Sequence, residues 1–318
     1  MPPRPARSSL LVTVAVLVAV IGGASPARAE ELGDPTAPVA SHRMGLDVSW
    51  PQCDRVLPEA TSFAVVGVNG GTAASTNPCL ADQLRWAVTA TSRTDADRPV
   101  QVYVNTANPG EVLEEYAVTT WPTDNRDARG ADSFQHIDAA RRNPYGRCAT
   151  TAARYNGYTN DLACSWQYGW NRAVESLDSR FAPAARAAGV SDDAADYTWW
   201  LDVETMNSWQ RGGTRGQARN AAALEGMAQF YSSEGVSEVG LYSTHYQWRR
   251  IVGEAVGSMD PAGHAIAGNL INAPAWLAGA ADPASAQLRC MTLTGLTSGP
   301  AVMNQYIADD LDHNLRCA

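Results

Sequence analysis

The chain has 318 residues, of which 33 are acidic and 24 basic, so its formal net charge is −9. This balance argues against a nucleic acid as partner, because binding to a phosphate backbone needs clustered basic residues. The length favours one large α/β domain over two domains of ordinary size.

The first 29 residues have the layout of a secretory signal peptide. Arg4 and Arg7 precede an apolar run at 10–21, and Ala27-Arg28-Ala29 follows it as a small-x-small cleavage site. We expect residues 1–29 to be removed and 30–43 to form a flexible lead. Because no later stretch approaches ~20 apolar residues, we expect a secreted protein, extracellular or associated with the cell wall, without a membrane anchor.

Six cysteines in an exported chain predict three disulfides. The sequence alone does not choose among the pairings that six cysteines allow; nearest-neighbour pairing is our guess, joining Cys53 to Cys79, Cys148 to Cys164 and Cys290 to Cys317. The cysteine spacings fit no zinc motif and the five histidines form no ligand pair, so we expect neither a metal nor another cofactor.

Apolar periodicity predicts strands that alternate with helices in the first part of the chain, which is typical of a mainly parallel sheet. Residues 106–165 are the least periodic and contain two cysteines, so we expect an ordered, disulfide-containing insertion there. After the last helix the pattern is mostly strands. The expected strands are 44–49, 63–68, 100–105, 198–204, 239–242, 264–270, 274–278, 288–293 and 301–307; the expected helices are 80–90, 168–188, 217–233 and 248–256.

The run at 198–204 ends in two acids, Asp202 and Glu204, separated by one residue. Side chains alternate along a strand, so both acids share one face. One carboxyl tuned as a proton donor beside another that stays ionised is a common catalytic arrangement. An isolated Asp-x-Glu also occurs at strand ends where both acids are simply exposed to solvent. The residues at the other strand ends must therefore show whether this pair belongs to an active site.

Polar side chains collect at the ends of the other expected strands. In a (β/α) barrel the chemistry lies at the carboxyl ends of the strands, so we expect a cleft there. Trp50 and Trp209, just past two acidic strand ends, offer aromatic faces to sugar rings or else pack the barrel rim. The remaining candidates are Asp47, Asn69, Tyr103, Asn105, Tyr242 and Gln305.

Four motifs in this order resemble the glycoside hydrolase family 25 lysozymes. They are Gly45-Leu46-Asp47-Val48-Ser49, Leu201-Asp202-Val203-Glu204, Val239-Gly240-Leu241-Tyr242-Ser243, and Gln305-Tyr306 followed by Asp312-x-Asn314. The resemblance spans about 44–314 and extends to exported actinobacterial proteins of uncharacterised function that carry this barrel.

This resemblance implies a TIM-like barrel over 44–318, with five strand-helix units closed by three further strands. It implies hydrolysis of the β-1,4 bond between N-acetylmuramic acid and N-acetylglucosamine in peptidoglycan, by a protein that we expect to be a monomer. Glu204 falls on the general acid, Asp202 on the residue that assists the substrate acetamido group, Asp47 on the first-strand acid, and Asp312 joins the substrate-binding set. We expect the charges of Asp202 and Asp47 to raise the pKa of Glu204.

Two departures from the family pattern leave alternatives open. The second strand ends in Gly67-Val68-Asn69-Gly70, where the family has a Lys and an acid, and Trp276-Leu277-Ala278 is followed by Gly279 where the family has a Tyr shortly after. The protein is therefore a muramidase-like enzyme, an inactive cell-wall or carbohydrate-binding protein on the same barrel, or a glycosidase for another acetylated polysaccharide.

Overall fold

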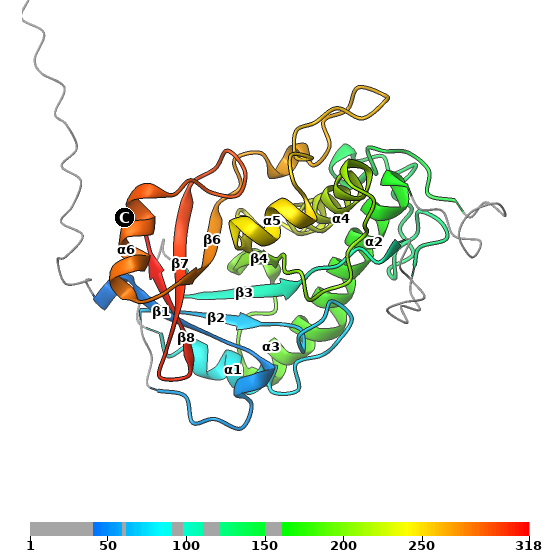
Figure 1. The fold of residues 1–318 in the computed structure, drawn as a ribbon. Coiled ribbons are helices and arrows are strands. Elements are labelled where there is room, and N and C mark those ends of the chain that lie inside the picture. The colour runs from blue at the N-terminus through cyan, green and yellow to red at the C-terminus, as the bar shows by residue number, and fades with distance from the viewer. Residues whose placement is uncertain (1–40, 59–61, 91–97, 111–120, 150–160, 318) are drawn as a thin grey trace, which may run out of the picture. The chain divides into compact units, whose positions relative to one another are not determined.

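Within the part of the chain that the computed structural model describes, eight strands close into a barrel in sequence order (Figure 1). The described residues are 41–58, 62–90, 98–110, 121–149 and 161–317, which all belong to one compact unit, Asp34–Ala318. Neighbouring strands pair in parallel from β1 to β7, whereas β8 runs antiparallel to both β7 and β1. The expected TIM-like barrel is thus confirmed. The strands are β1 (Met44–Val48), β2 (Phe63–Gly67), β3 (Val100–Asn105), β4 (Thr198–Asp202), β5 (Val239–Ser243), β6 (Ala275–Ala280), β7 (Ala301–Ala308) and β8 (Leu311–Arg316).

Helices connect the strands on the outside of the barrel. The α-helices are α1 (Leu80–Ala87), α2 (Leu162–Glu175), α3 (Ala182–Ala188), α4 (Thr214–Ser233), α5 (His245–Ile251) and α6 (Pro283–Thr292). A π-helical segment, Ser176–Phe181, joins α2 to α3. Asp161 caps α2 by accepting the Cys164 N–H, and Gly189 ends α3 with a φ of 74°, a left-handed conformation that favours glycine.

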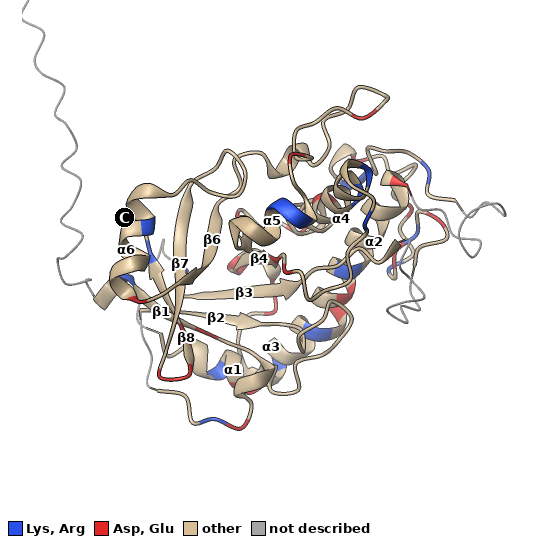
Figure 2. Ribbon diagram, viewed as in Figure 1, with Lys and Arg blue, Asp and Glu red and all other residues tan. Residues whose placement is uncertain are grey.

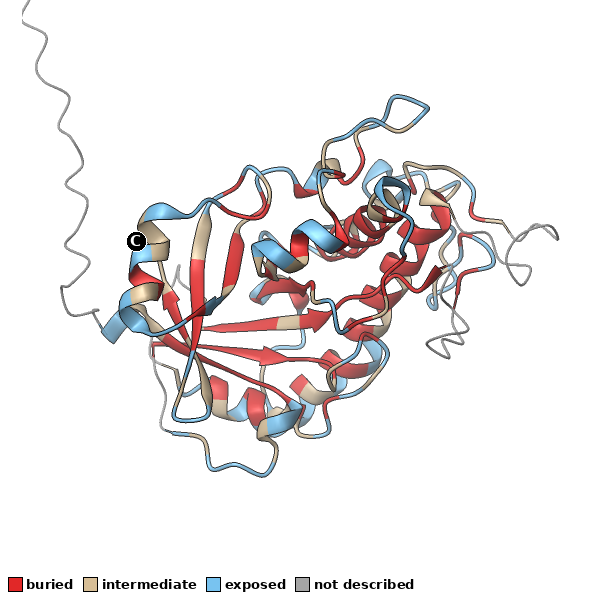
Figure 3. Ribbon diagram, viewed as in Figure 1, coloured by how far each residue is buried: buried red, intermediate tan, exposed pale blue. Residues whose placement is uncertain are grey.

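The barrel has an apolar outer face and an inner face that changes character along its axis. Outward side chains such as Val66, Val102 and Leu201 are fully buried beneath the helices, and the strands are buried along most of their length (Figure 3). Phe63, Val65, Trp200, Trp276 and Met303 form a cluster that fills the interior. Polar side chains lie beyond this cluster, toward the carboxyl ends of the strands. The apolar filling therefore forms the floor of any site at that end.

Helices α2 and α4 approach so closely that glycine is required at their contact. A Cβ atom on Gly169 would lie 1.8 Å from the Ala223 carbonyl oxygen, and one on Gly226 would lie 2.1 Å from the Trp166 carbonyl oxygen. Any larger residue at either position would push the helices apart. This contact fixes α4 behind β4, the strand that carries the acid pair.

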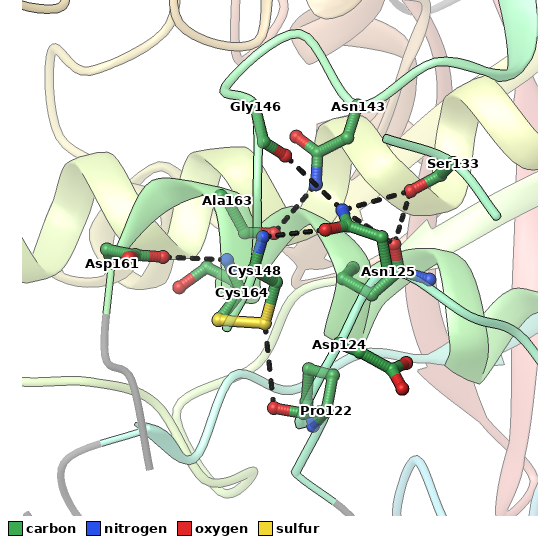
Figure 4. The surroundings of a disulfide bond; sticks show 12 residues. Pro122, Asp124, Asn125, Ser133, Asn143, Gly146, Cys148, Asp161, Ala163 and Cys164 are labelled. Atoms are coloured by element: carbon green, nitrogen blue, oxygen red, sulfur yellow. Dashed lines mark hydrogen bonds between the residues drawn. A yellow bond between two sulfur atoms is a disulfide. The ribbon is translucent and has the colours of Figure 1, made fainter. Parts of the chain in front are cut away.

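All three guessed disulfide pairings are confirmed: Cys53–Cys79, Cys148–Cys164 and Cys290–Cys317. Cys148–Cys164 ties the described part of the expected insertion to α2 (Figure 4). Around it, Asn125 Oδ1 accepts the Cys148 N–H at 2.7 Å, and Asn143 Nδ2 donates to the Ala163 carbonyl at 2.8 Å. Asparagine side chains of the insertion thus hold the backbone on both sides of this disulfide.

Several expectations concern residues outside the described ranges. These are the signal peptide at 1–29, the lead at 30–40, and 111–120 and 150–160 of the insertion. The last part of the lead, Ser41–Arg43, forms a short 3-10 helix in which Arg43 Nε donates to the Arg316 carbonyl at 2.7 Å. Among the described residues, no helix combines the length and apolarity needed to cross a bilayer.

The C-terminal third differs from the expected pattern at three places. The stretch 288–293 was expected as a strand, but 288–292 belong to α6, which begins at Pro283 behind an Asp282 cap. Residues 264–270 form turns and a short 3-10 helix (Gly268–Leu270) instead of a strand. Strand β8 was not expected, because its inward positions carry polar side chains and it follows β7 through a two-residue turn, Asp309-Asp310, with both φ angles positive.

Candidate active site

A pocket of about 150 Å³, which we call the acid pocket, opens at the carboxyl ends of the strands. It brings together seven of the residues expected from the sequence, contributed by six strands and by the loop after β4. Four of its lining residues are carboxylic acids and three are aromatic. The lining consists of Asp47, Tyr103, Asp202, Glu204, Tyr242, Trp276, Gln305 and Asp312.

Asp202 is the last residue of β4 and is more deeply buried than Glu204. It ends the strand in register with Asn105 on β3 and Tyr242 on β5, and its exposed fraction is 3%. Asn105 Nδ2 donates a hydrogen bond to Asp202 Oδ2, whereas Oδ1 accepts none from the described residues. Burial raises the pKa of Asp202 well above its ordinary value, and the charges of Glu204 and Asp47 raise it further against the Asn105 hydrogen bond.

Glu204 lies two residues farther on, past the end of β4, and is half-buried at the mouth of the pocket. Gln247 Nε2, on α5, donates to Glu204 Oε1 at 3.4 Å, while Gln247 Oε1 accepts the Thr205 N–H at 2.6 Å. The second contact fixes the orientation of the Gln247 amide, so its NH₂ group must face the acid.

The pKa of Glu204 is raised, as expected, and one of the causes was not expected from the sequence. Burial is the largest contribution and the charge of Asp312 also raises the pKa, while the Gln247 hydrogen bond lowers it. Asp202 and Asp47 were expected to supply the effect. Asp202 and Glu204 do repel each other. Asp312 adds to this repulsion because β8 pairs with β1, a pairing that the sequence did not predict.

Asp47 and Asp312 face each other across the antiparallel pair of β1 and β8. Like charges directly opposite in such a pair are destabilising. Asp47 is 6% exposed, and its Oδ1 accepts hydrogen bonds from Gln305 Nε2 at 3.0 Å and Asn314 Nδ2 at 2.6 Å. Burial, followed by the charge of Asp312, raises the pKa of Asp47 to about 8. Burial also raises the pKa of Asp312.

The floor of the acid pocket is aromatic and held by a hydrogen-bond chain. Trp276 is 1% exposed, its ring centroid lies 4.3 Å from that of Tyr242, and its Nε1 donates to Asn314 Oδ1 at 2.8 Å. At the other side, Tyr242 Oη donates to Gln305 Oε1 at 2.8 Å. Gln305 and Asn314 each also donate a hydrogen bond to Asp47 Oδ1. The same hydrogen-bond chain therefore positions the aromatic rings and the acid of β1.

Four expected site residues do not line the acid pocket. Asn105 lies behind Asp202, as described above. Asn69 is fully buried, where its Oδ1 accepts the Asn105 backbone N–H at 3.0 Å and its Nδ2 donates to the Ala73 carbonyl. Trp50 is 49% exposed on the short helix after β1, and Trp209 is buried with its Nε1 donating to the Glu204 carbonyl at 2.7 Å.

Three residues of the site were missed from the sequence: Trp276, Gln247 and Asn314. Asn314 carried a readable signal, because it lies two positions after Asp312 and shares its face. Trp276 was used only as part of a motif, although its alternation along β6 places it inside the barrel. Gln247 had no signal, because its position depends on how α5 packs beside the loop after β4. None of the described residues of the insertion expected at 106–165 lines the acid pocket.

A larger cavity, of about 600 Å³, lies at the opposite end of the barrel. It is lined by residues near the amino ends of the strands, including Thr198 and Val302, with Arg98 and Arg316 at its edge. Among the described residues, Glu238 is the one carboxylic acid in its lining. The proton-transfer groups therefore identify the acid pocket as the candidate active site, although it is the smaller of the two.

Comparison of the sequence with protein-family models gives no match, and comparison with curated proteins gives none. The structure is similar to solved structures of low sequence identity. A muramidase from Acremonium alcalophilum is 16% identical, with a TM-score of 0.45 and 86% of this chain and 93% of that chain covered. A bacterial lysozyme from Streptomyces coelicolor is 14% identical, with a TM-score of 0.44 and coverages of 89% and 94%. A muramidase from Trichobolus zukalii is 13% identical, with a TM-score of 0.45 and coverages of 86% and 93%.

Proposed function

We propose that the protein is an exported glycoside hydrolase that cleaves β-1,4 bonds in peptidoglycan. The observation that carries this proposal is Asp202 Oδ1, a buried acceptor in the acid pocket that no described residue satisfies. A buried acceptor without a donor costs free energy until a ligand supplies one. The N–H of a sugar acetamido group is such a donor, and peptidoglycan is the acetylated glycan that the sequence motifs imply.

Glu204 is the general acid in this proposal. Its raised pKa keeps a proton on the carboxyl closer to neutral pH, and the Gln247 N–H on Oε1 leaves Oε2 to carry that proton. The proton passes to the glycosidic oxygen as the bond from this oxygen to the anomeric carbon breaks. The leaving sugar departs with a new hydroxyl group.

Asp202 assists the other half of the reaction. It accepts the acetamido N–H while the acetamido oxygen of the same sugar attacks the anomeric carbon, which is a recognised variant of retaining hydrolysis. Water then opens this cyclic intermediate and gives its proton to the Glu204 carboxylate. Asp47 and Gln305 bind sugar hydroxyls, and the rings of Tyr242 and Trp276 offer apolar area to the pyranose.

Product analysis tests this proposal. The mature protein is incubated with purified peptidoglycan, and mass spectrometry identifies the new reducing ends, beside the variant Asp202→Asn. We expect N-acetylmuramic acid ends from the wild type and a fall of about a hundredfold or more in the variant. Release of other ends, or of none, contradicts the proposal.

Binding without turnover is the second candidate function. It is favoured by the end of β2, where Asn69 is buried and offers no side chain to a ligand. Sedimentation of the protein with the insoluble polymer, in the absence of released ends, would support this alternative. Export itself is supported by the three disulfides, which persist in oxidising compartments.

A further inference from the structure

A second pocket, of about 320 Å³, lies beside the loop after β4, and we call it the arginine pocket. Two arginines and none of the acids in the described part of the chain line it, although the whole chain carries a net charge of −9. All of its lining residues lie within a continuous described range. They are Thr205, Asn207, Trp209, Gln210, Arg211, Gly212, Gly213, Gln217, Arg250 and Ile251.

Asn207 is a buried donor in this pocket that lacks an acceptor. Its exposed fraction is 4%, and its Nδ2 makes no hydrogen bond with any described residue. Leaving such a group unpaired costs about 1–3 kcal/mol, which a ligand acceptor recovers. The described residues therefore leave this amide to an acceptor supplied by a bound ligand or by water.

Arg250 gives the pocket a positive charge that no carboxylate of the described chain neutralises. It lies on α5, whose basic part is visible in Figure 2, and its guanidinium donates to the neutral Tyr246 hydroxyl at 2.8 Å. The pocket also contains Gly213, the residue before α4, which has no side chain to cap the helix. The first turn of α4 thus adds partial positive charge to the same space.

The arginine pocket is joined to the acid pocket through the backbone of Glu204. The Glu204 carbonyl accepts the Asn207 N–H at 3.2 Å and the Trp209 indole N–H at 2.7 Å, and the next residue, Thr205, lines the arginine pocket. A sugar that presents its glycosidic oxygen to Glu204 therefore has this pocket beside it. A substituent on that sugar or its neighbour can enter it.

We propose that the arginine pocket is a subsite for a carboxylate carried by the glycan next to the cleaved bond. This inference rests on the proposed function and adds the anionic substituent that the enzyme selects. A carboxylate accepts charge-assisted hydrogen bonds from Arg250 and satisfies the Asn207 amide at the same time. In peptidoglycan two groups have this chemistry: the lactyl carboxylate of N-acetylmuramic acid, and a carboxylate of the peptide attached to it.

A matched pair of substrates tests this subsite. Peptide-free glycan strands are prepared with free lactyl carboxylates or with the same groups converted to amides, so that only the charge differs. A second pair carries peptides with free or amidated carboxylates. The ratio of kcat/KM within each pair is measured for the wild type, Arg250→Gln and Asn207→Asp, with Arg249→Gln as control. Arg249 is the neighbouring exposed arginine on α5 and lies outside the pocket lining.

We expect the wild type to prefer the free carboxylate in one of the pairs, and that pair identifies the source of the group. Arg250→Gln lowers this preference by roughly tenfold or more, Asn207→Asp lowers it by repulsion, and Arg249→Gln preserves it. Equal rates on both members of both pairs overturn the inference, as does a preference that survives Arg250→Gln.

Failure of the proposed function would look different. In that case the wild type cleaves none of the four substrates, and the subsite is tested by calorimetric binding of N-acetylmuramic acid saccharides and their amides. A preference for the carboxylate that Arg250→Gln abolishes supports the subsite without turnover. Equal binding of both forms overturns it. Thermal unfolding of each variant verifies that it is folded.

Discussion

Replacing Asp47 by Asn should make the protein more stable near neutral pH and reduce the dependence of its stability on pH. Asp47 is buried opposite Asp312, and its pKa is raised to about 8, whereas the ordinary value is 3.8. Between these two values the folded state keeps a proton that the unfolded chain has released. Because the folded state then binds more protons, this group makes the free energy of unfolding fall as pH rises from about 4 to about 8.

The size of the effect follows from proton linkage. A difference of one full proton changes the free energy of unfolding by about 1.4 kcal/mol per pH unit. Between pH 5 and pH 7 the wild type therefore loses about 3 kcal/mol through Asp47 alone. The Asp47→Asn variant has no such titration, and the amide oxygen of the new side chain can still accept the hydrogen bonds from Gln305 and Asn314.

Urea unfolding at pH 5, 6 and 7 measures this difference directly. The control is Asp309→Asn, which makes the same chemical change at an exposed turn position where Asn tolerates the positive φ. We expect the control to follow the wild type and Asp47→Asn to show a flatter profile. Equal pH dependence in the wild type and Asp47→Asn would refute a proton held on Asp47 in the folded state.

Two further predictions concern the neighbours of the acids. Replacing Gln247 by Met removes the hydrogen bond that lowers the pKa of Glu204, so the alkaline limb of the kcat/KM profile should move to higher pH; an unmoved limb or a shift to lower pH would contradict this role. Replacing Trp276 by Phe removes the N–H that Asn314 Oδ1 accepts, so the free energy of unfolding should fall by about 1–3 kcal/mol in urea titrations; an unchanged value would mean that Asn314 finds another donor.

Strand periodicity predicted the barrel well where one face is apolar. Residues 100–105 alternate strictly and form β3, and 44–49 and 63–68 differ from β1 and β2 by a single terminal residue. The same rule failed for β8, because Asp312 and Asn314 occupy its inward face and leave few apolar positions. A strand whose inward face is polar at several positions, such as β8, is thus hard to recognise, since functional residues replace the apolar residues that periodicity needs.

The site was predictable where a side chain is on a strand and less so where it is on a loop. Alternation placed Asp47, Asp202 and Tyr242 on the inner face, and all three line the acid pocket. Trp50 and Trp209 lie in the segments after β1 and β4, yet the ring of Trp50 lies against Gly71 and that of Trp209 is buried, with its N–H donating to the Glu204 carbonyl. Loop direction depends on tertiary packing, which one-dimensional patterns do not contain.

Release of reducing ends from purified peptidoglycan by Glu204→Gln is the most direct test of the account. The control is Glu238→Gln, which makes the same change at the opposite end of the barrel. We predict that the wild type and the control release N-acetylmuramic acid ends at similar rates, while Glu204→Gln falls by about a hundredfold or more. If Glu204→Gln keeps the wild-type rate, Glu204 is not the general acid, and the acid pocket performs no hydrolysis of the kind proposed.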